Sequence, residues 1–155
     1  MEIERRRGTP TADELRVWRE YVETGERIRS AMAGAMQRRT GISSGDYAVL
    51  LALSEAEGRR LRSSALADAA HWERSRLSHH LPRMERRGLI RREDCATDDR
   101  GAEVVLSAEG LRVFRQASAA HFGLIRELFV DALTPEGLAQ AHEVSAALSE
   151  HLRAR

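Results

Sequence analysis

The residues best suited to chemistry lie in one short stretch, ERSRLSHHLPRMERRGLIRRE, which spans residues 73 to 93. Residues 74 to 92 contain seven arginines and a single acidic residue, Glu85. The local charge is therefore +6 before either histidine is protonated, although the whole chain carries only +1. Guanidinium groups and hydroxyls hydrogen-bond phosphates and the acceptor edges of guanine in a DNA major groove. The stretch therefore suggests a surface that binds nucleic acid.

A helix over residues 75 to 87 would separate the apolar from the polar side chains of this stretch. At 100° per residue, Leu77, Leu81 and Met84 form one apolar line, and the arginines, serines and histidines fall outside it. A basic stripe on a helix is most often only its solvated face. The basic stripe alone therefore does not distinguish a solvated surface from a binding surface. The sequence that follows the helix provides that evidence.

A β-hairpin is predicted directly after the basic helix. LIRRED and AEVVLS are short β-branched or alternating runs, and CATDDRG between them is rich in turn residues. Arg100 would lie at the exposed tip, where a guanidinium can enter a narrow, electronegative minor groove, and Asp98 could hold it in position. A hairpin that follows a basic helix at the sequence distance of a wing favours DNA binding. The predicted DNA-contacting residues are Ser75, Arg76, Ser78, His79, His80, Arg83, Arg87, Asp98 and Arg100.

Two helices are expected before the basic stretch. Thr11 and Glu14 have the spacing of a capping box, and helical periodicity then continues to about residue 39. This helix is unusually long for one that packs only within its own monomer. A second helix begins with Ser43 or Ser44 as its cap and is predicted to stop at Gly58.

Further helices flank the predicted hairpin. SSALADAA forms a short third helix, and Gly88 ends the fourth, basic helix. Ser107 caps a fifth helix after the hairpin. Thr134 caps a sixth, with Pro135 at its first position.

The third and fourth helices, followed by a hairpin, have the order of a winged helix-turn-helix. Leu66 and Ala70 are expected to face the core from the third helix, and Trp72 to fill the space under the turn. His71 occupies the turn position where such proteins favour glycine. Pro82 removes a backbone hydrogen bond inside the basic helix, which predicts a kink there or a tilt of its C-terminal half.

Residues 43 to 110 resemble the DNA-binding core of the MarR family of bacterial transcription regulators. Two stretches carry the resemblance: RSRLSHHLPRMERRGLIRRE, similar to the family's recognition helix and first wing strand, and DDRGAEVVLSAEG, similar to its wing and the start of the next helix. The long flanking helices extend it over nearly the whole chain. The resemblance implies a homodimer whose terminal helices interlock, with each winged lobe docked on half of a palindromic double-stranded operator.

The expected fold class is therefore mainly α with a small β-hairpin wing: a winged helix-turn-helix lobe plus long N- and C-terminal dimerisation helices. The expected segments are a flexible tail (1–10), an N-terminal dimerisation helix (11–42), the DNA-binding lobe (43–106) and C-terminal dimerisation helices (107–155). The resemblance also implies a small aromatic or phenolic ligand, bound between the dimer domain and the lobe, that releases a repressor from DNA. Trp18 could line that site.

Other function classes lack support in the sequence. No catalytic constellation, phosphate-binding loop or metal-ligand spacing can be argued, so no enzyme activity, metal or cofactor is expected. Cys95 has no second cysteine to pair with, and no apolar run approaches the length of a membrane span, which together favour the cytoplasm. One alternative stays open, namely an all-α dimeric metal, redox or protein-interaction sensor whose lobe does not read DNA.

Overall fold

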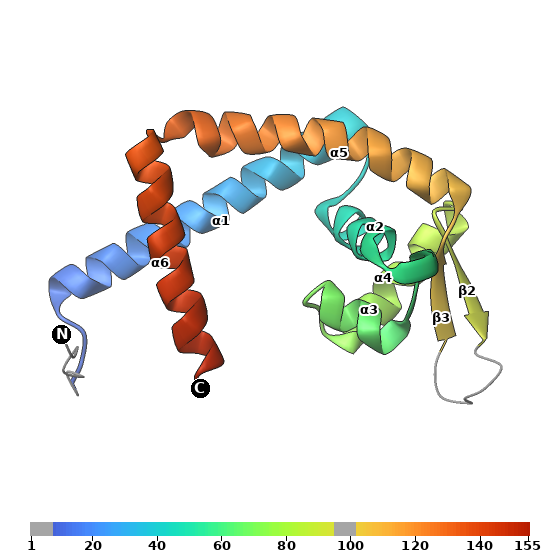
Figure 1. Cartoon of the computed structure of the whole chain (residues 1–155), viewed down its shortest axis with the longest axis horizontal. Helices are drawn as coiled ribbons and strands as arrows, with labels where there is room; N and C mark the ends of the chain where they lie inside the picture. The colour runs from blue at the N-terminus through green and yellow to red at the C-terminus, as the bar shows by residue number, and fades with distance from the viewer. Residues whose placement is uncertain (1–7, 95–101) are drawn as a thin grey trace.

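A computed structural model describes residues 8–94 and 102–155 and consists mainly of helices (Figure 1). Long helices lie beside a lobe of shorter helices and a small sheet. The helices are α1 (Ala12–Thr40), α2 (Ser44–Glu55), α3 (Ser63–Ala69), α4 (Arg74–Arg86), α5 (Ala108–Leu128) and α6 (Pro135–Arg153). The predicted fold class, mainly α with a winged helix-turn-helix lobe, is confirmed.

Capping residues set the starts of four helices, α1, α2, α5 and α6, where the sequence predicted them. Thr11 begins α1 with a complete capping box, in which its hydroxyl accepts from the N–H of Glu14 and the Glu14 carboxylate accepts from the N–H of Thr11. Ser43, rather than Ser44, caps α2 in the same manner with Asp46. The hydroxyls of the two remaining caps, Ser107 and Thr134, also accept from backbone N–H groups, at the starts of α5 and α6.

The sheet has three strands, although only a two-stranded hairpin was predicted. Its strands are β1 (Arg60–Arg62), β2 (Ile90–Asp94) and β3 (Ala102–Leu106), in the antiparallel order β1-β3-β2. Arg60 pairs with Val105 and Ile90 with Leu106. The prediction missed β1 because three residues with a single apolar side chain carry no measurable alternation.

The second helix is shorter than predicted. It ends at Glu55, and Gly58 lies in a short 3₁₀ helix, η1 (Glu57–Arg59), with a φ of +63°. Gly58 is therefore a turn residue on the way into β1 and does not stop the helix itself. Pro82, by contrast, does not end α4, which continues through it to Arg86.

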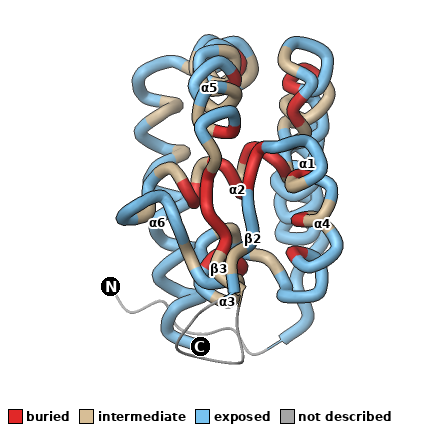
Figure 2. Tube along the Cα trace, turned by 90° about the vertical axis from the view of Figure 1, so that its right-hand side faces the viewer, coloured by how far each residue is buried: buried red, intermediate tan, exposed pale blue. Residues whose placement is uncertain are grey.

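The hydrophobic core lies where the lobe meets α5. Figure 2 shows buried positions along α2 and β3, and the core also takes apolar side chains from α3, α4 and α5. The largest fully buried apolar side chains are Met36, Leu50, Leu53, Leu66, Leu77, Met84, Ile90 and Leu124. The expected inward line of Leu77, Leu81 and Met84 is therefore confirmed, whereas Ala70 is only half-buried.

The long helices carry large apolar side chains that are exposed to solvent. α1 packs along α5, where Arg39 donates two hydrogen bonds to Glu127 at 3.1 and 2.9 Å. No residue of α6, all of which the structure describes, is buried. The exposed large apolar residues are Leu15, Val17, Trp18, Tyr21, Val22, Phe122, Phe129, Val144, Leu148 and Leu152. Within the described residues, no helix is both long enough and apolar enough to span a bilayer.

Candidate nucleic-acid interface

The turn between α3 and α4 presents α4 to solvent. His71 adopts a left-handed conformation with a φ of +55°, at the position where the sequence departs from the usual glycine. The N–H of His71 donates to the carbonyl of Asp68, and that of Trp72 donates to the carbonyl of Ala67. The turn is thus closed by backbone hydrogen bonds, and Trp72 packs half-buried against the core beneath it.

One face of α4 is apolar and buried, and the other carries exposed polar side chains. Leu77, Leu81 and Met84 anchor the helix to the core. Arg76 lies over the Trp72 ring, with its guanidinium carbon 4.0 Å from the ring centroid. Five of the predicted DNA-contacting residues are exposed on this helix: Ser75, Arg76, Ser78, His79 and Arg83. Because α4 is continuous through Pro82, Arg83 shares one helix with Arg76.

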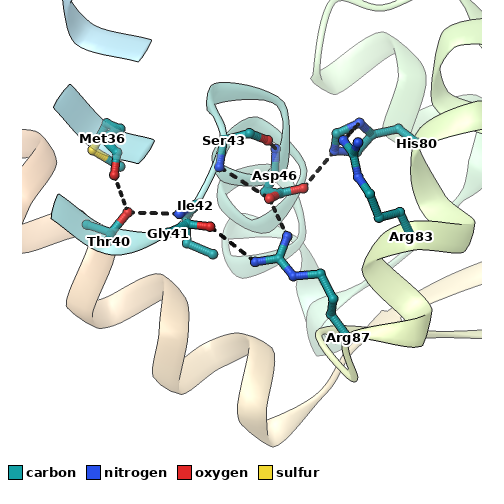
Figure 3. A network of polar contacts seen from close by, with 9 residues as sticks. All are labelled: Met36, Thr40, Gly41, Ile42, Ser43, Asp46, His80, Arg83 and Arg87. Atoms are coloured by element: carbon teal, nitrogen blue, oxygen red, sulfur yellow. Dashed lines mark hydrogen bonds and ion pairs between the residues drawn. The ribbon is translucent and has the colours of Figure 1, made fainter. Parts of the chain in front are cut away.

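Two predicted contact residues, His80 and Arg87, are engaged within the lobe by Asp46 of α2 (Figure 3). His80 Nε2 lies 2.8 Å from Asp46 Oδ1, and the His80 side chain is only 13% exposed. Arg87 Nη1 donates to Asp46 Oδ2 at 2.6 Å, and its Nη2 donates to the carbonyl of Gly41 at 3.3 Å. These two side chains therefore connect α4 to the α1–α2 corner.

Asp46 is the one buried charged side chain among the described residues. Burial by itself raises the pKa of its carboxyl, but hydrogen bonds from Arg87, from the Ser43 N–H and from His80, with the charge of Arg87, outweigh that effect. The net result is a pKa below the ordinary value. The carboxylate is therefore stabilised in its charged form, as a buried charge must be.

Asp46 was not predicted from the sequence as a site residue. SSGDY does show a capping box, and Asp46 does serve that role. Its contacts with α4, however, join residues 34 and 41 positions apart, and no local pattern predicts them. The preceding residue, Gly45, belongs to the same contact, because a Cβ there would lie 2.9 Å from His80 Cε1 and 3.0 Å from the Trp72 ring, but a single glycine near a helix start does not reveal this in the sequence.

Not every arginine of the basic stretch is free to contact a partner. Arg92, in β2, donates to both oxygens of Glu85 through its N–H and its side chain. Arg91 lies 3.4 Å from a carboxylate oxygen of Glu93. Among the described residues of this stretch, the arginines without a carboxylate partner, Arg74, Arg76, Arg83 and Arg86, all lie on α4. Two predicted wing residues, Asp98 and Arg100, lie outside the described residues, as does Cys95.

Trp18 lies on the N-terminal half of α1 and is 65% exposed. It borders a hollow formed with residues 8–11, Glu14 and Leu15, not one between the long helices and the lobe. A different hollow, of about 500 Å³, lies between α1, α2 and α5 and is lined by Arg29, Met32, Tyr47 and His121, among others. Within this chain, Trp18 therefore does not line the hollow between α1, α2 and α5.

His121 is the polar group of this second hollow with an unsatisfied atom. Its Nδ1 is buried and has no hydrogen-bond partner in the described part of the chain. The ring lies 4.4 Å from the Tyr47 ring, centroid to centroid. Burial lowers the pKa of His121, which favours its neutral form. No group of three or more metal-ligating side chains gathers within residues 8–94 and 102–155.

A sequence profile for the MarR family matches residues 40–101. AbsC, a MarR family transcriptional regulator from Streptomyces coelicolor, is 36% identical to this chain. The match covers 96% of this chain and 99% of AbsC, with a TM-score of 0.83. The chain belongs to the MarR family.

Other members of the MarR family are similar over different lengths. Sco3205, a MarR family regulator from the same organism, was solved in complex with DNA. Sco3205 is 37% identical to this chain, with a TM-score of 0.84. The match covers 94% of this chain and 91% of Sco3205. HosA, a transcriptional regulator of Escherichia coli O127:H6 (strain E2348/69 / EPEC), is 42% identical over 71 residues. This match covers 46% of the chain and 51% of HosA, so the chain spans about half the length of that curated relative.

Proposed function

We propose that this MarR family member is a sequence-specific, double-stranded DNA-binding transcription regulator, with α4 as the helix that enters the major groove. The observation that carries the proposal is the exposed face of α4, where Arg76 rests on Trp72 and serines and Arg83 point to solvent while the opposite face is buried. Guanidinium forks on such a helix suit phosphates and guanine edges. Sco3205, similar over nearly its whole length, was solved with DNA.

The exposed apolar surface supports action as a homodimer. A helix without a buried residue, such as α6, is not stable in water by propensity alone and needs a packing partner. Tyr21, Val22, Phe129 and Val144 line a groove of about 830 Å³ between α1 and α6. A two-fold partner that contributes the same helices would cover this surface. Two lobes related by a two-fold axis would then read a palindromic operator.

A small aromatic ligand would fit the hollow between α1, α2 and α5 better than the surface around Trp18. A phenol or aromatic carboxylate could stack among Met32, Met36 and Tyr47 and against the His121 ring, which also lines the hollow. This hollow joins the long helices to the lobe. Occupation of it could therefore change the placement of the lobe and release a repressor from DNA in the cytoplasm.

The decisive experiment is selection of duplexes from a random-sequence pool by the full chain. A selected duplex should bind about 10³-fold tighter than random DNA at physiological salt. Arg112→Ala offers a matched control, since this exposed arginine lies on α5 and pairs with Glu109 away from α4, and its removal should leave the preference intact. If no sequence is enriched, the proposal is wrong. The alternative of an all-α dimeric metal, redox or protein-interaction sensor would then be preferred.

A further inference from the structure

Asp46 stands at the meeting point of three segments: the end of α1, the start of α2 and the length of α4. Its two oxygens accept from the Ser43 N–H, His80 and Arg87 at 3.2, 2.8 and 2.6 Å (Figure 3). Arg87 also donates to Gly41, the left-handed residue that ends α1. A single buried carboxylate therefore joins the DNA-facing helix to the corner of the long helix.

The hydrogen bonds of His80 define which ring nitrogen carries the proton. Arg83 Nη2 lies 3.3 Å from His80 Nδ1, and a guanidinium can only donate, so Nδ1 must be the acceptor. The proton of the neutral ring is then on Nε2, where it is donated to Asp46 Oδ1. Asp46 thus selects the tautomer that leaves Nδ1 open to Arg83.

Packing holds the ring of His80 in this orientation. Trp72 meets it edge to face, with centroids 5.1 Å apart. Gly45 provides the space on the α2 side, because any Cβ there would contact His80. The charged groups around the ring come from two sides. Asp46 of α2 contacts it, with Arg87, just after α4, bound to the same carboxylate. From α4 itself, Arg83 contacts the ring, and the exposed Arg76, Arg86 and neighbouring His79 line the same hollow as the ring.

We propose that Asp46 is a positioning residue of the DNA-contacting surface: through the Nε2–H tautomer of His80 it sets the direction of the Arg83 guanidinium. The inference rests on the proposed function, because it assigns the DNA-reading role to Arg83. Asp46 and His80 themselves do not touch DNA in this scheme. Removal of the carboxylate frees the His80 ring to adopt the other tautomer, in which Nδ1–H repels the Arg83 donor.

The link between Asp46 and His80 can be tested without DNA. Nitrogen-15 NMR of the neutral His80 ring should show the Nε2–H tautomer in the full wild-type chain and a mixture of tautomers in Asp46→Asn. A wild-type ring protonated on Nδ1 would overturn the proposal. So would a folded Asp46→Asn variant whose His80 ring is unchanged. This readout would not move if Asp46 only stabilised the fold.

The link between His80 and Arg83 can be tested by a double-mutant cycle on a selected duplex. His80→Leu should weaken specific binding about tenfold when Arg83 is present and less than twofold in the Arg83→Ala background. His80→Gln, whose amide retains one donor and one acceptor, should restore most of the affinity. Equal losses in both backgrounds, or no loss in either, would overturn the proposal.

The cycle also separates this inference from the proposed function. If the wild-type chain selects no duplex, the proposed function fails, whereas the NMR measurement still reports on the tautomer. If the wild-type chain selects a duplex but the cycle is additive, only the positioning role of Asp46 fails. If Asp46→Asn does not fold, the two remaining measurements still test the proposal. A wild-type His80 ring protonated on Nδ1, or equal losses in both backgrounds of the His80 cycle, would overturn it.

Discussion

The guanidinium of Arg76 and the indole of Trp72 are stacked, with 4.0 Å between the guanidinium carbon and the ring centroid. The same indole meets the His80 ring edge to face. One half-buried side chain therefore supports two residues of the α4 surface. A stacked guanidinium loses less conformational freedom when it binds, which suits Arg76 to a specific contact.

Replacement of Arg76 by alanine should therefore weaken binding to a selected duplex by about 1–3 kcal/mol per site if it contacts guanine. Binding to random DNA should fall less. Arg76→Lys is the matched control, because it retains the charge and loses the fork, so it should retain non-specific affinity and lose specificity. Fluorescence anisotropy with both duplexes measures the two effects. Equal losses on selected and random DNA would show that Arg76 contacts only phosphate.

Gly110 should be sensitive to the smallest substitution. It lies in the first turn of α5, where a Cβ would overlap the carbonyl oxygen of Leu89 and crowd Leu106. Gly110→Ala is therefore expected to cost about 3 kcal/mol of unfolding free energy, at the upper end of overpacking effects. Gly123→Ala, on the same helix with nothing within 4 Å of its Cβ, should instead stabilise by about 0.5–1 kcal/mol.

Urea denaturation of both glycine variants at one protein concentration tests this contrast. Comparable stability of the two variants would contradict the close approach of α5 to Leu89, between α4 and β2.

The buried carboxylate of Asp46 should make stability depend on acid pH. Its folded-state pKa lies below the unfolded value, so its contribution is fully present above the unfolded pKa of about 3.9 and is lost as pH falls through the lower folded value. Asp46→Asn should cost about 1–3 kcal/mol near neutral pH. The difference from wild type should shrink below about pH 4. A difference that is constant with pH would mean that the carboxylate is not the stabilising form.

Charge placed on the apolar face of α6 should separate the proposed dimer. Leu148→Glu, on the same helical face as Val144 and Leu152, is expected to raise the fraction of monomer at low micromolar concentration. Ala139→Glu provides the control, because Ala139 lies on the opposite face of α6, about 180° around the helix axis from Leu148. This variant should remain dimeric. Sedimentation velocity distinguishes the two. A wild-type chain that sediments as a compact monomer would rule out the homodimer.

The ligand site can be located by its effect on DNA binding. A phenol or aromatic carboxylate that binds between α1, α2 and α5 should weaken operator binding by a coupling free energy of about 1–3 kcal/mol. His121→Leu should abolish that response, because it removes the imidazole ring that lines the hollow, and should leave DNA binding intact. Trp18→Phe should keep the response. Anisotropy titrations with a panel of such compounds test this, and a response lost with Trp18 would place the ligand near the start of α1.

Local signals account for the parts of the fold that were predicted from the sequence. The side-chain oxygen of each cap accepts from the backbone N–H three residues on, so a cap can be recognised without tertiary information. The four caps are Thr11, Ser43, Ser107 and Thr134. β1 has no such signal. It exists because β3 offers an unpaired edge, which is a property of the folded sheet and not of residues 60 to 62.

The difference between local signals and contacts that depend on the folded structure also explains which site residues could be predicted. Helical periodicity places Ser75, Arg76, Ser78, His79 and Arg83 outside the buried line, and the structure agrees. His80 and Arg87 lie nearer the edge of the buried face, where a side chain can turn either way. Asp46 decides their direction, and its position relative to α4 depends on how α2 packs.

Ser107 connects the wing and α5 directly to the end of α4. Its hydroxyl donates to the Gly88 carbonyl, and α5 then continues without interruption for 21 residues, about 32 Å. In the proposed homodimer, this rod would set both the spacing of the two α4 helices and their rotation about the DNA axis. One inserted residue would add about 1.5 Å and turn the lobe by about 100°, whereas seven would add about 10 Å and turn it by only about 20°. The length of α5 thus restricts which half-site spacings a single dimer can span.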